Sequence, residues 1–226
     1  MLNPDDITAL QITLRLALIT TAILLLLGTP LAWWLAHTRS AIKPVVDAIV
    51  TLPLILPPTV LGFYLLLALG PRGPIGRLVE FVGGQPLAFT FSGLVIGSVV
   101  YSFPFVVKPL QDAFASIGRR PLEVAATLGA RPVDRFFTIA LPLARPGYLT
   151  AMVLGFAHTL GEFGVVLMIG GNIPGATQVL SISIYDHVEM LEYGQAHVLS
   201  SMLLILSFLL LLSVYLLNRR FLIFRT

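Results

Sequence analysis

Long runs of apolar residues dominate the pattern of hydrophobic and polar positions along this chain. Four runs carry no charge over about the 20 residues that a helix needs to cross the hydrocarbon core of a bilayer: residues 16–36, 48–69, 87–107 and 198–217. A fifth run, residues 146–170, is interrupted by a single acid, Glu162. The pattern predicts an all-α integral membrane protein, a polytopic helical bundle with five spans.

One further apolar segment leaves the number of spans open. The stretch "VLSISIY" (residues 179–185) is too short to cross a bilayer and is typical of a re-entrant or interfacial piece. The bundle would have six spans only if residues 176–192 crossed the membrane as well.

Composition supports the membrane assignment and removes several kinds of chemistry. The chain is 57% hydrophobic and 11% charged, with a mean hydropathy of +0.93, which is outside the range of ordinary soluble domains. It opens with "MLNPDD" rather than a basic segment, so we expect no cleaved signal peptide and a first span that stays in the mature protein. Without cysteine there is no disulfide, thiolate metal site or thiol nucleophile. We expect residues 1–226 to form a single transmembrane domain.

Positive charge predicts the orientation of this domain. Lysines and arginines gather in residues 39–43, 108–145 and 219–225, and such segments stay on the cytoplasmic side. Three segments then lie outside: the acidic N-terminus, the loop with Arg72, Arg77 and Glu80, and the segment with Asp186, Glu189 and Glu192. Five spans with the N-terminus outside and the C-terminus in the cytoplasm satisfy every segment. Topology therefore explains the net charge of +3, and we infer no nucleic-acid partner from it.

The predicted cytoplasmic loop, residues 116–142, contains a short capped element, "PLEVAATLGARPVDRFFTIALP". Pro121 suits the first position of a helix and Gly129 suits the position just after its end, which predicts a helix over residues 121–128. A second helix starts at Pro132. The spacing alone leaves two interpretations open, a loop that happens to be helical or a surface on which another protein docks. A face of small residues and one leucine favours docking: Leu122, Ala125, Ala126 and Gly129.

The same stretch resembles the signature loop of ATP-binding-cassette importer permeases, here E-x-A-A-x-x-G followed after nine residues by I-x-L-P. The matching positions are Glu123, Ala125, Ala126, Gly129, Ile139, Leu141 and Pro142. The resemblance implies the fold of a type I importer permease, with a coupling helix that docks into a cleft of a partner ATPase. It places the ATPase-coupling residues at Glu123, Ala125, Ala126, Gly129, Ala130 and Arg131.

Nearly the whole chain is similar to the molybdate permease group. The segments that carry this similarity are "LPLILPPTVLGFYLL" (52–66), "GPRGPIG" (70–76), "HTLGEFGVVLMIGGNIPG" (158–175) and "SIYD" (183–186). The resemblance implies import of a tetrahedral oxyanion, molybdate first, then tungstate or sulfate, because sulfate permeases share the coupling loop and a GEFG-like stretch. After "IPG" the group often has Glu and Arg, where this chain has Ala176 and Gln178.

Partners follow from the same resemblance and from the number of spans. An importer permease works with two ATPase subunits and an extracytoplasmic oxyanion-binding protein, in the cell membrane of a prokaryote. Five helices are too few to enclose a gated passage, so we expect a homodimer with twofold symmetry.

Glu162 is the only acid well inside a predicted span. Because an ionisable side chain is costly to place inside a membrane, a functional role is the default hypothesis for it. Two interpretations remain open: a structural hydrogen bond to nearby backbone or to His158, or a part in a gate. A stripe at steps of four, four, three and four places it on one face of its span: Gly147, Ala151, Gly155, His158 and Glu162.

The predicted passage offers hydroxyl groups rather than cations. Only Arg15 lies near the inside of a span, close to its outer end, so we expect no high-affinity anion site in the membrane. Thr59, Ser98 and Ser102 would give an oxyanion transient contacts. The prolines of "LPLILPP" (52–58) break the second span, either to line a passage or as a static kink.

Other classes of protein fit the sequence less well. A metal site needs at least three protein ligands, and His37, His187 and His197 lie near span ends or outside them. No G-x-S-x-G, P-loop or G-x-G-x-x-G motif is present, so we expect no catalytic residue, no cofactor and no nucleotide site in this chain. An autonomous secondary carrier or channel is the competing class, but carriers usually show inverted repeats and midplane acids for ion coupling.

Overall fold

Helices make up the ordered elements of the computed structural model, which describes residues 3–223. In that range three single helices are long and apolar enough to cross a membrane: α1 (Pro4–His37), α5 (Phe91–Ile117) and α12 (Tyr193–Ile223). Two further pairs of helical segments pass the same test, but each pair is bent at a short break. The first pair is α2 (Lys43–Ile55) and the segment Pro58–Phe81, with a bend of 112° between them. The second pair is the segment Pro132–Leu143 and α9 (Arg145–Leu160), with a bend of 72°. The predicted all-α bundle is confirmed, and it has five spans if each bent pair is one span. Arg225, one of the charges used to predict orientation, lies outside the described residues.

The break between α2 and α3 (Pro58–Leu69) falls where the sequence predicted it. Leu56 and Pro57 have extended backbone, with ψ of 136° and 134°. Proline offers no N–H for a helical hydrogen bond and disfavours helical backbone in the residue before it, so the helix stops here. Beyond the break, α3 leads into α4 (Pro74–Phe81) and packs on α10 (Gly164–Gly170). A Cβ on Gly62 would lie 2.8 Å from the Cβ of Met168, so α3 and α10 are in close contact.

The apolar run 146–170, the fourth predicted span in chain order, is not a single helix, contrary to the prediction. The helix α9 ends at Leu160, and residues 161–163 separate it from α10. The backbone N–H groups of Gly161 and Glu162 bond to the carbonyls of His158 and Thr159 in a tight turn, and Phe163 leaves the helical region (φ −129°, ψ −65°). Glu162 therefore sits in a non-helical turn, two residues past the helix that was expected to carry it.

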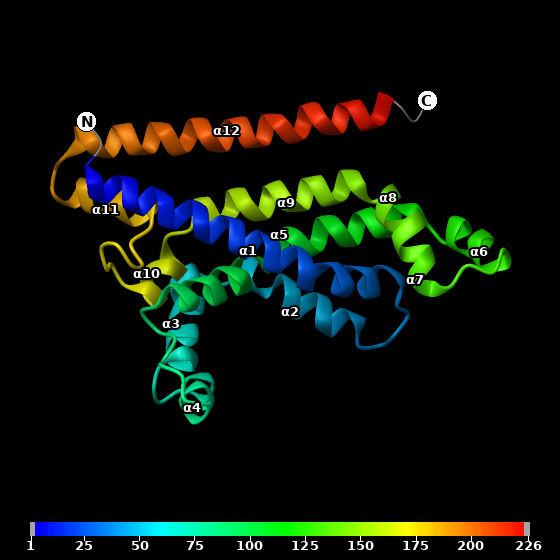
Figure 1. Cartoon of the computed structure of the whole chain (residues 1–226), viewed down its shortest axis with the longest axis horizontal. Coiled ribbons are helices and arrows are strands. Elements are labelled where there is room, and N and C mark those ends of the chain that lie inside the picture. Colours follow the sequence, from blue (N-terminus) through cyan, green and yellow to red (C-terminus); the bar gives the residue numbers. More distant parts are fainter. Residues whose placement is uncertain (1–2, 224–226) are drawn as a thin grey trace.

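The segment 176–192 does not add a sixth span. Its helix α11 (Leu180–Glu189) has 10 residues, about half of what a span needs. The backbone N–H of Leu180 donates to Thr13 Oγ1 at 2.7 Å, which fastens α11 to α1. Figure 1 shows α11 beside the start of α1, where the chain turns into α12. The segment is therefore too short to span, which agrees with the prediction of a re-entrant or interfacial piece.

The long helices run nearly parallel to the long axis of the molecule (Figure 1). The beginnings of α1 and α12 lie at one end with α11. At the other end lie the last turns of α12 and the short elements α6 (Arg120–Thr127), α7 (Pro132–Arg135), η1 (Phe136–Ala140) and α8 (Leu141–Leu143). The helix predicted at 121–128 is confirmed to within one residue at each end, and it projects from the bundle.

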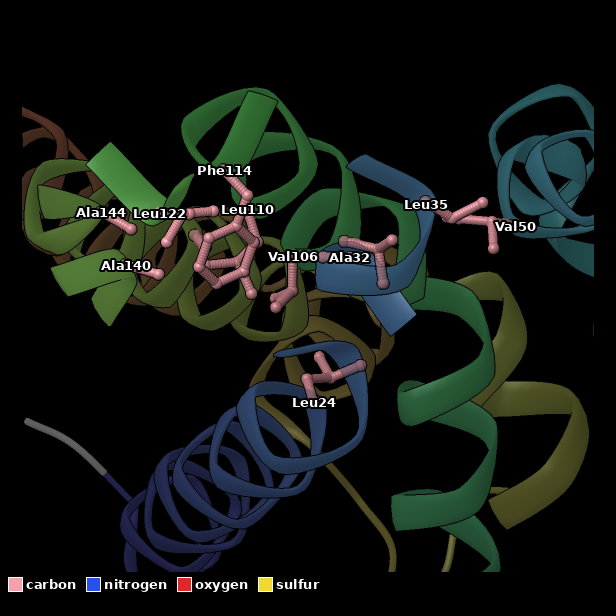
Figure 2. Packing of buried hydrophobic residues seen from close by; sticks show 12 residues of the cluster. Leu24, Ala32, Leu35, Val50, Val106, Leu110, Phe114, Leu122, Ala140 and Ala144 are labelled. Atoms are coloured by element: carbon pink, nitrogen blue, oxygen red, sulfur yellow. The ribbon is translucent and has the colours of Figure 1, made fainter. Parts of the chain in front are cut away.

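Small residues let α9 pack closely on α5. A Cβ added to Gly147 would lie 2.2 Å from the Cβ of Ala113, and one added to Gly155 would lie 2.6 Å from Val106 Cγ2. Ala151, between them, is fully buried. The predicted small-residue stripe is thus the face that α9 turns toward α5. Figure 2 shows the buried cluster that fills the space between α1, α5 and the elements before α9.

Candidate functional site

Four of the five predicted pathway residues form one hydrogen-bonded cluster between α5 and the end of α9. Glu162 is 3% exposed, and its carboxylate accepts hydrogen bonds from Ser98 and from Ser102, the latter at 3.2 Å. The Ser102 hydroxyl also lies 2.9 Å from His158 Nδ1 and 3.2 Å from Thr159 Oγ1. Glu162 therefore meets His158 through Ser102 rather than directly. The expected structural hydrogen bond, from Glu162 to nearby backbone or directly to His158, is therefore not the one formed: the carboxylate instead joins the turn after α9 to α5.

The cluster holds a carboxyl group without a cation beside it. Among the side chains that the structure describes, residues 3–217, the ion pairs are Lys108–Asp47, His187–Asp6 and His187–Glu192, and none of them includes Glu162. Burying an ionised carboxyl is costly unless hydrogen bonds offset the lost water. The hydroxyls of Ser98 and Ser102 supply these bonds to the carboxyl group, while the Ser181 hydroxyl donates to the main-chain carbonyl oxygen of Glu162.

A cavity of about 590 Å³ opens beside this cluster at the break between α2 and α3. Three of the predicted residues line this cavity: Thr59, His158 and Glu162. Ser98 and Ser102 do not line it but donate hydrogen bonds to the carboxylate of Glu162. The fold therefore brings all five predicted pathway residues to one place. The proline break helps to make this cavity, because Pro58 lies in its wall.

Sequence reasoning missed Tyr101 and Thr159. Tyr101 lines the cavity, and its ring lies 4.8 Å from that of His158, centroid to centroid. The signal was available on α5, because Ser98, Tyr101 and Ser102 are three and four residues apart and share a face. The His158 ring also stacks on Phe105, with 3.8 Å between ring centroids, so two aromatic rings help to fix its position.

The cavity wall carries no arginine or lysine. Arg15, the cation nearest to a predicted span interior, is exposed, and its guanidinium lies 4.8 Å from the centre of the Phe91 ring. An anion in this cavity would meet hydroxyl, imidazole and backbone groups, and also the carboxyl group of Glu162. In residues 3–223 no three His, Asp or Glu side chains come close enough to hold a metal ion.

A second cavity, of about 420 Å³, lies at the opposite end of the molecule from α6 and is acidic. His187 lines it and bridges two acids, with Nε2 3.0 Å from Asp6 and Nδ1 2.8 Å from Glu192. Burial lowers the pKa of His187, but the hydrogen bonds and charges of these two acids outweigh burial, so its pKa is raised. Gln178, where the resembling group often has a charge, donates to Asp186 at 2.9 Å. The acids make this cavity a poor place for a dianion.

The predicted coupling residues lie on α6 and the turn after it. Glu123, Ala126, Gly129 and Arg131 are exposed, whereas Ala125 is buried and Ala130 is partly buried. The Gly129 N–H donates to Ala126 and the Ala130 N–H donates to Ala125, both at 3.0 Å, which is a Schellman motif. Gly129 has φ of +84°, as this motif requires.

A helical bundle with a cavity at a helix break and a capped helix projecting from one end has the architecture of a type I importer permease. The fold agrees with that of the MetNI methionine ABC transporter in inward-facing conformations, with a TM-score of 0.73 over 95% of this chain and 94% of that one, at 18% identity.

Sequence comparison gives the family. The model of the "Binding-protein-dependent transport system inner membrane component" family matches residues 28–223. The chain is 60% identical to the molybdenum transport system permease protein ModB of Azotobacter vinelandii over 97% of each chain. It is 37% identical to ModB of Haemophilus influenzae over 81% of this chain and 80% of the relative. The chain therefore belongs to the binding-protein-dependent transport permeases, and within them to the molybdenum permease group.

Proposed function

We propose that this chain is the membrane subunit of an importer that moves molybdate from a soluble binding protein to the cytoplasm by alternating access. The observation that carries the proposal is the 60% identity to a molybdenum permease over 97% of both chains. A cavity beside a hydrogen-bonded gate cluster and a projecting coupling helix are the parts such a subunit needs.

Energy would come from another chain. This sequence has no nucleotide-binding motif, so we propose that two ATPase subunits bind at the end of the molecule where α6 projects. The family's own description makes transport dependent on a binding protein, which we place at the opposite, acidic end. In this arrangement the N-terminus lies outside and the C-terminus in the cytoplasm, in the inner membrane of a prokaryote.

A second copy of the chain would complete the passage. Pro58 and Thr59, at the start of α3, line the cavity, and two large side chains on either side of them in the chain are exposed, Ile55 at 78% and Tyr64 at 65%. A homodimer would bury this face and enclose the passage between two copies. Thr59, Ser98, Ser102, His158 and Glu162 would then contact or gate the oxyanion, and hydroxyls in the wall suit a cargo that must be released.

Uptake of labelled molybdate by vesicles tests the proposal. The vesicles contain this chain, its ATPase and a loaded binding protein, and we expect ATP-dependent accumulation that tungstate reduces more than sulfate. Stronger competition by sulfate would assign the chain to sulfate import. Accumulation without the ATPase, or failure of the ATPase to co-purify with the chain, would favour an autonomous carrier.

A further inference from the structure

The signature helix α6 has two faces with different surroundings. Val124 and Leu128 are 59% and 83% exposed, whereas Leu122 is 9% and Ala125 is 8% exposed. Residues three apart on a helix lie on one side, so Leu122 and Ala125 form an inner face that is covered by the chain itself. A partner protein can touch the outer face of α6 but has little access to the inner one.

Leu122 is the side chain through which α6 joins the hydrophobic core. It belongs to the same buried cluster as Phe114 of α5 and Ala140 of η1, both fully buried. Figure 2 shows Leu122 among the side chains of Phe114, Leu110 and Ala140. A second tie is polar, since Arg135 Nη1 donates to the carbonyl oxygen of Leu122 at 3.4 Å.

Four aromatic rings join three long helices where Leu122 enters the core. The Phe114 ring lies 5.1 Å from that of Trp33 on α1 and 6.0 Å from that of Tyr148 on α9. Phe136 of η1 completes the group, 5.2 Å from Trp33 and 6.0 Å from Phe114. The Tyr148 hydroxyl donates to Thr29 Oγ1 at 2.9 Å, a further tie between α9 and α1. We call Trp33, Phe114, Phe136 and Tyr148 the aromatic socket.

The chain itself is a poor transmitter of movement at both ends of α6. Gly118 before the helix has φ of +70° and ψ of −176°, and Gly129 after it has φ of +84°. Glycine moves through such torsions at little cost, so both joints can bend when α6 is pushed. Packed side chains are much less compressible and pass a displacement to their neighbours. The stiff route from α6 to the spans therefore runs through Leu122.

We propose that Leu122 is a positioning residue of the transport cycle: it passes movements of α6 through the aromatic socket to the ends of α1, α5 and α9. The two faces of α6 then have different roles. The outer face, with Val124 and Leu128, contacts the ATPase, and the inner face, with Leu122 and Ala125, moves the membrane-spanning helices. The proposal rests on the proposed function, since it needs a partner that moves α6.

The test compares Leu122→Ala with Leu16→Ala in vesicles that hold the whole transporter. Both changes remove the same atoms from a buried site, but Leu16 lies in a separate cluster, in the first half of α1, whereas Trp33 of the aromatic socket lies in its last turns. We expect Leu122→Ala to keep the ATPase bound and to lower molybdate imported per ATP hydrolysed by about fivefold or more, a usual size for coupling between sites. Leu16→Ala should keep the parental ratio, and Leu122→Met, which nearly conserves volume, should restore it.

Each outcome separates coupling from general loss of stability. A parental ratio in Leu122→Ala, or an equal fall in Leu16→Ala, overturns the proposal. If Leu122→Ala fails to assemble, Phe114→Leu decides, because it keeps an apolar side chain in the socket but removes the ring; a parental ratio there overturns the proposal too. If the unmodified chain neither retains an ATPase nor imports molybdate, the proposed function has failed instead.

Discussion

At the residue scale, the backbone of Gly129 fixes where α6, the proposed coupling helix, ends. Its φ of +84° is a left-handed conformation in which a Cβ would meet no atom within 4 Å, so any cost of a side chain there is conformational rather than steric. The Schellman bonds of Gly129 and Ala130 depend on that conformation.

Gly129→Val should therefore weaken the end of α6 by about 1–2 kcal/mol, because a β-branched residue resists positive φ. We expect the variant to insert in the membrane at the parental level but to retain less ATPase on co-purification. Gly194→Val is the matched control, since Gly194 has open space around its Cβ position and no positive φ. Equal retention of ATPase in both variants would contradict the prediction.

Glu162 allows a second test at this scale, because charge and hydrogen bonding can be separated. Glu162→Gln keeps the shape and two polar ends, and the hydroxyls of Ser98 and Ser102 can rotate to suit them. Glu162→Ala leaves the fully buried Ser98 hydroxyl without its acceptor, which costs about 1–3 kcal/mol.

We expect Glu162→Gln to reach parental abundance in the membrane with lower molybdate uptake, and Glu162→Ala to be less stable to heat in detergent. Uptake and abundance are measured on the same vesicles. Parental uptake in Glu162→Gln, with damage confined to Glu162→Ala, would leave Glu162 a purely structural role.

Sequence alone predicted some of these residues and not their partners. The cap at Gly129 follows from local chemistry, a proline start and a glycine stop, so it was readable. The bonds from Ser98 and Ser102 to Glu162 join positions 64 and 60 residues apart, and only the packing of α5 on α9 brings them together. The positive φ of Gly118, at the end of α5, was not predicted. The helix α5 continues to Ile117, ten residues past the end of the apolar run 87–107 from which this span was predicted.

At the scale of elements, the contact between α5 and α9 organises the site. The stripe of small residues on α9 was predicted from spacing, but its partner helix was not, because small residues permit close approach without selecting a neighbour. The end of α9 before Glu162 was also unpredicted. Glu162 is the one acid that interrupts the apolar run 146–170, and a single acid does not by itself predict where a helix ends.

Gly147→Ala tests how tight this contact is. The new Cβ would lie 2.2 Å from the Cβ of Ala113, which has no side-chain rotation to relieve the overlap, so the two helices must separate. Overpacking of this kind costs about 1–3 kcal/mol, which is more than the gain of about 0.5–1 kcal/mol from placing alanine in a helix. We expect the midpoint of thermal unfolding in detergent to fall by several degrees. Gly194→Ala, at an open position near the start of α12, should leave it unchanged or raise it.

At the scale of the whole molecule, the two ends differ in chemistry. One end holds the acidic cavity with Asp6 and His187, and the other holds α6 and the loop rich in arginine (Figure 1). An odd number of spans puts the termini on opposite sides, and the positive-inside rule then orients the bundle. Five spans counted from the sequence agree with the structure only when each bent pair is taken as one span.

Single-cysteine labelling tests this orientation cleanly, because the natural chain contains no cysteine. Gln85→Cys lies in the exposed loop after α4, on the side predicted to face outward, and Thr127→Cys lies at the exposed end of α6. A thiol reagent that cannot cross membranes should label Gln85→Cys in right-side-out vesicles and Thr127→Cys in inside-out vesicles, with the unmodified chain giving the background. Thr127→Cys should also lose its labelling when the ATPase subunit is bound, because that subunit would cover α6. Labelling of Thr127→Cys from the outside would reverse the topology and leave α6 unable to meet a cytoplasmic ATPase.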